Sequence, residues 1–270
     1  MRIYHVDAFT SEPFTGNPAA VCLLTAPREP AWMHALAAEL NLPMTAFVRR
    51  TGDGERFDLR WFSVSGESRL CGHGTLAAAH VLWESGEARP RGPISFDTCS
   101  GELLASQLEG GWIEIDFPAE VAAAEERPAL AQELGVRPVW MGRNRLHWLV
   151  EVDSEAAVRA VRPDFPRLAA VLPPASGVIV AAPAAAGAGY DFVSRFFAPL
   201  AGVDEDAATG SAHCALGPHW AARFGKPRLL AHQASARGGN LRVHACGARV
   251  HVAGQAVSLF HGELAEKEAS

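Results

Sequence analysis

The 270-residue sequence has no run of basic residues, no long apolar stretch and no closely spaced pair of cysteines. Its net charge is −6, so nucleic-acid binding has no electrostatic support. No segment approaches the roughly 20 apolar residues that a membrane span needs. Residues 1–7 are typical of a strand rather than of a signal peptide. We therefore expect neither nucleic acid nor a membrane among the partners of this protein.

The cysteines are few and scattered. There are five of them, an odd number without any CxxC spacing: Cys22, Cys71, Cys99, Cys214 and Cys246. Such a set argues against a disulfide framework and against a structural zinc site. A reducing, cytoplasmic location fits this composition best.

The two halves of the sequence resemble each other. Arg60-Trp61-Phe62 leads into a glycine turn at Gly72, and Arg195-Phe196-Phe197 leads into one at Gly210. The two arginines are 135 positions apart, which is half of the chain. Each turn is followed by a helical stretch and then by a Gly-x-Leu strand start. The common order and spacing favour an internal duplication over chance.

Each half shows the same sequence of expected elements. Alternating apolar and polar residues are typical of half-buried strands, and one helix follows each turn. We predict an α+β fold of two similar lobes, each a curved sheet around a central helix. Proline marks the junction, so we expect an N-terminal lobe at 1–117 and a C-terminal lobe at 118–255. The C-terminal strand 256–264 is a candidate to complete the N-terminal lobe.

Both turns have the form of an anion site. A glycine turn that opens a helix presents free backbone N–H groups and the positive end of the helix dipole. Two ordinary capped helices would have the same form. If the copies face each other, however, Cys71-Gly72-His73-Gly74 and Thr209-Gly210-Ser211 line one cleft between the lobes. This arrangement predicts a site for a small anionic substrate.

The side chains of the turns add chemistry. His73 can act as an acid or a base near neutral pH, although a capping role is also open. Asp206 can bind a substrate amine or hydroxyl, orient His73 or cap a helix. Ser211 offers a hydroxyl and a backbone donor, or an N-cap.

Cys71 and Thr209 take equivalent places in the two turns. A racemase with two thiol bases needs a cysteine at both, and a threonine alkoxide is far too basic at neutral pH. Cys214, five residues further on, is more typical of core packing. Symmetrical thiol-based racemisation is therefore disfavoured.

Several ordered blocks of the chain resemble the PhzF phenazine-biosynthesis family. They are Asp7-Ala8-Phe9 with 14–21, Glu67 with 70–80, 195–199 with 205–213, and 235–239. The resemblance implies a diaminopimelate-epimerase-like fold, a homodimer and the use of no cofactor and no metal. It also implies proton transfer, because the best-understood member isomerises trans-2,3-dihydro-3-hydroxyanthranilate in this way.

The resemblance assigns roles by matching position. His73 and Asp206 become the expected catalytic residues. The expected substrate-binding residues are Asn17, Gly72, Gly74, Thr209, Gly210 and Ser211.

One position departs from the family pattern. The family usually has Ser-Glu-Thr-Ala-Phe, with the glutamate as acid and base, whereas this chain has Pro43-Met44-Thr45-Ala46-Phe47. Met44 has no ionisable proton, so we treat it as an altered catalytic position. Glu39 fits a solvated helix face and Glu67 has its own place in the pattern, so neither is a convincing substitute. His73 alone, or with Asp206, is left as the proton carrier.

Three hypotheses follow. The first is a PhzF-like isomerase that moves a proton on a small carboxylic acid, without a cofactor, between the lobes. The second is an amino-acid epimerase or racemase of the same fold that uses Cys71. The third is a catalytically inactive binding protein, for which Met44 is the best argument.

Overall fold

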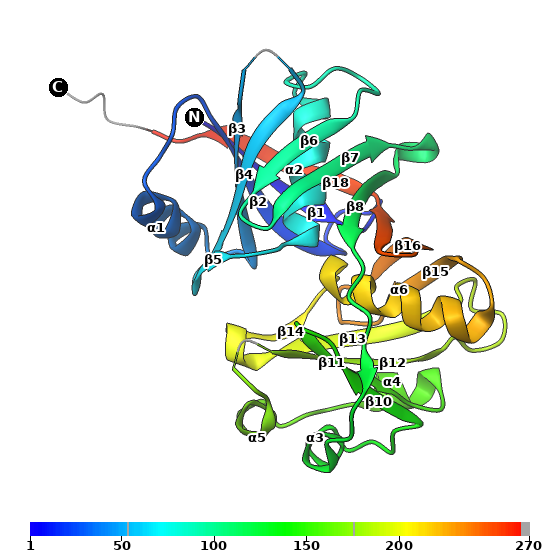
Figure 1. Ribbon diagram of the computed structural model, residues 1–270. Coiled ribbons are helices and arrows are strands. Elements are labelled where there is room, and N and C mark those ends of the chain that lie inside the picture. Colours follow the sequence, from blue (N-terminus) through cyan, green and yellow to red (C-terminus); the bar gives the residue numbers. More distant parts are fainter. Residues whose placement is uncertain (53, 175, 266–270) are drawn as a thin grey trace. The chain divides into compact units, whose positions relative to one another are not determined.

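A computed structural model describes residues 1–52, 54–174 and 176–265 (Figure 1). Contacts between residues divide the chain into two compact units. The N-terminal lobe is Met1–Asp116 together with the residues from Ala253 onward, and the C-terminal lobe is Phe117–Val252. These bounds differ slightly from the predicted ones: Phe117 groups with the C-terminal lobe, and 253–255 group with the N-terminal lobe. No helix in the described part of the chain is long and apolar enough to span a bilayer.

The N-terminal lobe combines many short strands with two α-helices. Its elements are β1 (Arg2–Ala8), β2 (Asn17–Leu24), α1 (Pro30–Leu40), β3 (Met44–Arg50), β4 (Arg56–Ser63), β5 (Gly66–Ser68), α2 (Gly72–Glu84), β6 (Ile94–Thr98), β7 (Gly101–Gln107), the 3-10 turn η1 (Glu109–Gly111), β8 (Ile113–Pro118) and β18 (Ala256–Glu263).

The strands of this lobe follow a fixed order of pairing. β18 and β2 pair with β1 antiparallel, β3 pairs with β2 parallel, and β4 pairs with β3 antiparallel. β6 then pairs with β4 parallel, and β7 and β8 continue antiparallel. The C-terminal strand β18 therefore forms part of the N-terminal sheet.

The helix α2 packs against β1, β2, β3 and β18 and forms the centre of this lobe (Figure 1). Almost all of its side chains are buried, including the alanines 77–79 and Trp83. A helix that is apolar on every side is expected inside a core rather than on a surface. Small alanine side chains let the surrounding strands approach it closely.

The C-terminal lobe contains the second copy. Its elements are β9 (Ala123–Ala124), α3 (Pro128–Leu134), β10 (Trp140–Arg143), β11 (His147–Glu151), α4 (Glu155–Ala160), α5 (Phe165–Val171), β12 (Gly177–Pro183), β13 (Phe192–Ala198), η2 (Pro199–Ala201), β14 (Val203–Asp206), α6 (Gly210–Phe224), β15 (Arg228–Gln233), β16 (Gly239–Cys246) and β17 (Arg249–Gly254).

The pairing in the C-terminal lobe repeats that of the first. β9 and β11 pair with β10 antiparallel, β12 pairs with β11 parallel, and β13 pairs with β12 antiparallel. β15 joins β13 parallel and β16 joins β15 antiparallel, while α6 packs on β15 and β16. The predicted α+β fold with an internal duplication is confirmed.

The strand register shows which residues of the two copies are equivalent. Phe47 pairs with Arg60 in the first copy, and Val180 pairs with Arg195 in the second. Met44 and Gly177 each lie three residues before these positions and are therefore equivalent. Their parallel partners, Ala19 and His147, correspond in the same way.

A substitution of Gly142 on β10 tests how tightly the sheet of the C-terminal lobe is packed. A Cβ at this position would lie 2.5 Å from the Ala123 carbonyl oxygen and 2.2 Å from the Trp140 ring. Gly142→Ala should therefore lower the free energy of unfolding by about 1–3 kcal/mol through overpacking. Urea denaturation measures the change. Gly262→Ala is the control, because a Cβ there meets nothing within 4 Å, and equal losses in both variants would contradict the packing argument.

Candidate active site

The first predicted turn is the start of α2, where Cys71 is the N-cap. The Cys71 backbone is extended, and its Sγ accepts a hydrogen bond from the Gly74 N–H at 3.3 Å. Thr75 donates its hydroxyl to the Cys71 carbonyl oxygen at 2.6 Å. His73 lies within this turn, 6% exposed, with Nδ1 3.6 Å from Cys71 Sγ. The capping role considered for His73 thus belongs to Cys71, and the imidazole lies beside the thiol.

Met44 lies against this same turn. A Cβ built on Gly74 would come within 3.3 Å of Met44 Cγ, 3.0 Å of Cys71 Sγ and 2.9 Å of Trp61 Cδ1. The Met44 side chain therefore fills space beside the start of α2. Gly74 has a packing reason to be glycine, in addition to the substrate contact predicted for it.

Asn17 begins β2 and is completely buried opposite Ala8 of β1. The loop that precedes it is fixed by Asp7, whose Oδ2 accepts a hydrogen bond from the Phe14 N–H at 2.8 Å. The structure thus places Asn17 at a strand start, within the core of the N-terminal lobe.

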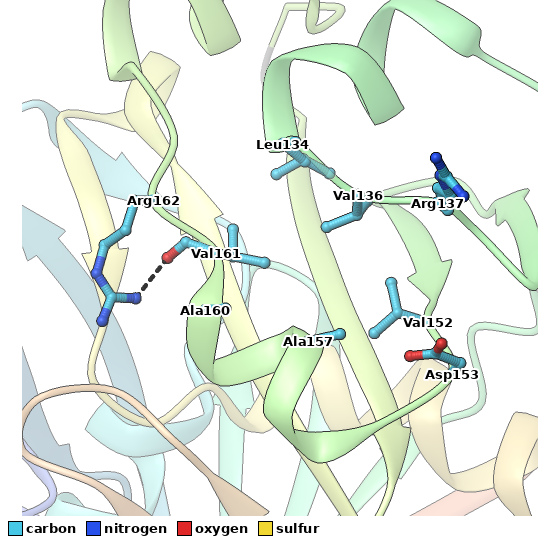
Figure 2. A pocket seen from close by; sticks show the side chains of 10 residues that line it. Leu134, Val136, Arg137, Val152, Asp153, Ala157, Ala160, Val161 and Arg162 are labelled. Atoms are coloured by element: carbon cyan, nitrogen blue, oxygen red, sulfur yellow. Dashed lines mark hydrogen bonds between the residues drawn. The ribbon is translucent and has the colours of Figure 1, made fainter.

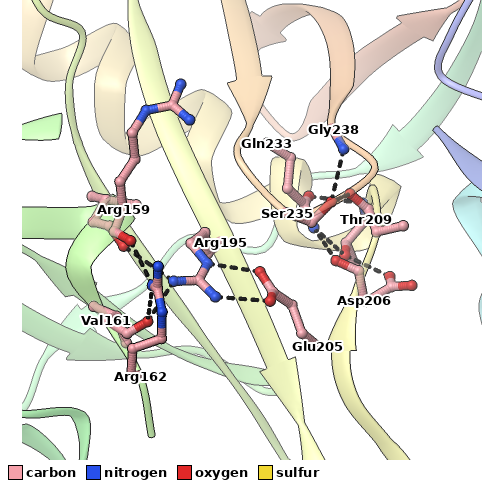
Figure 3. A network of polar contacts seen from close by, with 12 residues as sticks. Arg159, Val161, Arg162, Arg195, Glu205, Asp206, Thr209, Gln233, Ser235 and Gly238 are labelled. Carbon is pink, nitrogen blue, oxygen red and sulfur yellow. Dashed lines mark hydrogen bonds and ion pairs between the residues drawn. The ribbon is translucent and has the colours of Figure 1, made fainter. Parts of the chain in front are cut away.

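The second predicted turn is the start of α6, where Thr209 is the N-cap. Its hydroxyl does not cap the helix but donates to Asp206 Oδ2 at 2.5 Å. Gln233, fully buried on β15, accepts a hydrogen bond from the Thr209 N–H and donates to the Asp206 carbonyl oxygen, both at 2.8 Å (Figure 3). Gly210 and Ser211 are the first two residues of the helix. Asp206 and Thr209 are therefore held as one group by a buried amide.

Gln233 was missed by sequence reasoning, although a signal was present. The inward positions of β15 alternate, so that Leu229, Ala231 and Gln233 are buried while the residues between them are not fully buried. A polar residue on the buried face of a strand needs hydrogen-bond partners. The loop carbonyl and N–H groups before α6 supply them.

A serine in each lobe fixes the segment before the central helix. Ser100, between β6 and β7, donates its hydroxyl to the Arg69 carbonyl oxygen at 2.6 Å. Ser235, between β15 and β16, donates to the Ala207 carbonyl oxygen at 2.7 Å (Figure 3). Arg69 and Ala207 each stand two residues before an N-cap, so the two tethers are equivalent.

An arginine–glutamate pair is also common to both lobes. Arg60 Nε and Nη2 donate to the two carboxylate oxygens of Glu67 at 2.7 and 2.8 Å, and Arg195 binds Glu205 at the same distances. The hydrogen bonds from Arg60 hold the pKa of Glu67 below its usual value. The Glu67 carboxylate is thus already bound by Arg60, and Glu39 is exposed on α1.

The equivalent positions of the two turns carry different side chains. In pairs 138 positions apart, they are Ser68 and Asp206, Cys71 and Thr209, Gly72 and Gly210, and His73 and Ser211. The first turn therefore contains a titratable imidazole and a thiol. The second contains a carboxylate and two hydroxyls.

Two further residues of α6, His213 and Cys214, are buried and uncharged at neutral pH. His213 donates its Nδ1–H to the Thr209 carbonyl oxygen at 2.8 Å, and burial lowers the pKa of His213 to about 4. The imidazole is therefore neutral at pH 7. Burial raises the pKa of the Cys214 thiol far above its usual value. Cys214 does not supply the thiolate that Thr209 lacks.

A pocket of about 390 Å³ opens elsewhere in the C-terminal lobe (Figure 2). Its walls include Leu134, Val136, Val152 and Val161, with Arg137 at the edge. No predicted site residue belongs to this described lining. We therefore assign it no part in the predicted site.

The neutral His213 makes stability depend on pH. The pKa in the folded protein is about 4, below the ordinary 6.5, so the unfolded chain takes up the proton first as the pH falls. The contribution of His213 to the free energy of unfolding should be fully present above pH 6.5. It should decrease towards pH 4 by about 1.4 kcal/mol per pH unit. Urea unfolding at pH 7.5 and 5 should show a smaller loss for His213→Gln than for the unchanged protein. His34→Gln, at an exposed histidine, should keep the full loss, and equal losses in all three proteins would contradict the assignment.

Gln233 should stabilise the second turn. Gln233→Leu leaves the buried Thr209 N–H without its acceptor, which costs about 1–3 kcal/mol. Denaturant unfolding measures the loss, and Gln132→Leu, at an exposed glutamine of the same lobe, is the matched control. An unfolding free energy unchanged by Gln233→Leu would show that the turn does not depend on this amide.

The chain is similar to known proteins over nearly its whole length. The family model described as phenazine biosynthesis-like protein, PhzC-PhzF, matches residues 6–262. Two relatives named as uncharacterized isomerases, from Halalkalibacterium halodurans and Pseudomonas aeruginosa, are 46% and 47% identical. The alignments cover 97% and 98% of both chains, respectively.

A solved structure shows the same fold. The crystal structure of a PhzF-family phenazine biosynthesis protein from Enterococcus faecalis superposes with a TM-score of 0.90 at 36% identity. The match covers 97% of this chain and 98% of the other. The match of the family model and of these relatives confirms the resemblance drawn from the motifs. The chain belongs to the PhzC/PhzF family of phenazine biosynthesis-like proteins.

Proposed function

We propose that the protein is an isomerase that moves a proton on a small carboxylic acid. One observation carries this proposal: the two equivalent helix starts have become chemically unequal. The start of α2 holds His73 beside Cys71, and the start of α6 holds Asp206 hydrogen-bonded to Thr209. Relatives with more than 45% identity are named as isomerases, which supports the same reaction class.

The proposed reaction separates proton transfer from anchoring. His73 accepts a proton from a substrate carbon as the neutral imidazole and returns it to a second carbon, so that the enzyme ends unchanged. Backbone N–H groups at Gly72 and Gly210 stabilise the negative charge that develops in between. Asp206 binds an amine or hydroxyl of the substrate, and Ser211 donates to its carboxylate.

Met44 is consistent with proton transfer by His73 and anchoring by Asp206 and Ser211. Its side chain lies against Gly74, so position 44 adjoins the turn that contains His73. With no ionisable group at 44, and with Glu67 held by Arg60, His73 is the titratable side chain of this turn suited to carry the proton at neutral pH. The reaction we propose therefore needs His73 as its base and no carboxylate at position 44.

Proton transfer to and from carbon can be observed by exchange with solvent. The protein is incubated in deuterium oxide with a panel of small carboxylic acids that includes trans-2,3-dihydro-3-hydroxyanthranilate. Mass spectrometry then detects incorporated deuterium, and chromatography detects the isomer. His73→Gln should reduce turnover by about 10²–10⁴, the usual contribution of a general acid–base group. His34→Gln, at an exposed histidine of the same lobe, should keep it.

Anchoring by Asp206 predicts a different kinetic signature. Asp206→Asn should raise KM more than it lowers kcat, because it removes a substrate contact rather than the proton carrier.

Turnover that survives in His73→Gln would refute the role of His73. Binding by calorimetry without deuterium incorporation or product, for every compound bound, would identify a binding protein instead of an isomerase.

A further inference from the structure

We propose that the β16–β17 hairpin binds a zinc-like transition metal ion through His244, Cys246 and His251. One imidazole nitrogen from each histidine and the cysteine Sγ all lie within 4.8 Å of one another. The rings of His244 and His251 have their centroids 5.7 Å apart. The residues thus form a cluster of three donors in the C-terminal lobe.

The hairpin explains why these three residues meet. β16 ends at Cys246 and β17 begins at Arg249, so a two-residue loop joins them. Gly247, the first residue of this loop, has φ +65°, a positive value that two-residue hairpin loops favour at this position. In a two-residue hairpin His244 stands opposite His251, and Cys246 shares the face of His244 because side chains alternate along a strand.

The donor set selects the class of ion. Imidazole nitrogen and thiolate sulfur suit zinc, cobalt, nickel and copper, whereas magnesium and calcium prefer oxygen ligands. Zinc–nitrogen and zinc–sulfur bonds of about 2.0 and 2.3 Å place tetrahedral donors roughly 3.5 Å apart. Rotations of the exposed Cys246 and the partly buried histidines can close the difference from 4.8 Å. On binding, the thiol becomes a thiolate and its proton passes to solvent.

The cluster is separate from the proposed catalytic residues. β16 begins at Gly239, which pairs with Gln233 beside Asp206 and Thr209. His244 lies five residues further along the strand, about 16 Å at 3.3 Å per residue. The metal and the isomerase substrate are thus expected to bind independently. The spacing His-x-Cys-x4-His contains no CxxC pair, which is why the cysteine pattern alone gave no indication of it.

Cobalt and zinc titrations test the site. The purified full-length protein, reduced and freed of metal by a chelator, is titrated with Co²⁺ and then with Zn²⁺. We expect one ion per chain and a thiolate-to-cobalt charge-transfer band that Zn²⁺ abolishes. Cys246→Ser should remove that band. Cys246→Ser and His251→Gln should each weaken Zn²⁺ binding by about tenfold or more, since even indirect supporting residues cost that much.

Cys99→Ser is the matched control, because Cys99 is the other exposed cysteine of the chain. It should leave the band and the zinc affinity unchanged. Circular dichroism verifies that each variant is folded. If Cys246→Ser does not fold, the zinc affinity of His251→Gln decides the test. The proposal is overturned if the unchanged protein shows no thiolate band. It is equally overturned if the hairpin variants bind Zn²⁺ as tightly as the unchanged protein.

Discussion

Both central helices begin inside the core, and this requires their first backbone N–H groups to find partners within the protein. A buried helix start without such partners is strongly unfavourable. In α2 the Cys71 thiol accepts the Gly74 N–H, and at α6 the Gln233 amide accepts the Thr209 N–H. The serine tethers and the arginine–glutamate pairs hold the preceding segments. The backbone conformation of each turn depends on these hydrogen bonds and ion pairs.

The duplication preserved the support of these turns and changed their chemistry. The tethers of Ser100 and Ser235 have the same geometry, and so do the ion pairs of Glu67 and Glu205. The residues at the helix starts differ: Cys71 caps α2 through its thiol, whereas Thr209 makes no side-chain cap at α6 and its own N–H is bound by Gln233. The serine hydrogen bonds and the ion pairs are therefore kept in both lobes, while the side chains at the two helix starts differ.

Burial fixes the protonation state of His213 at the start of α6. His213 is the residue of α6 that bonds back to the N-cap carbonyl, as Thr75 does in α2, and its low pKa keeps it neutral. It therefore acts as a hydrogen-bond donor that orders the helix start. His73, in the first turn of α2 next to a thiol, has a different environment. The two histidines thus have different partners, the Cys71 thiol for His73 and the Thr209 carbonyl oxygen for His213.

The sequence by itself determined the duplication, the α+β class and the position of the two glycine turns, because these follow from local spacing and periodicity. It also placed Met44 at the position where the family resemblance implies a glutamate. Only the tertiary structure decided that Cys71 caps α2, that Gln233 joins Asp206 to Thr209, that Glu67 is held by Arg60, and that His251 meets Cys246. Each of these depends on strand register or on side-chain direction. A one-residue change of register reverses the face on which a side chain lies, so spacing alone cannot supply such contacts.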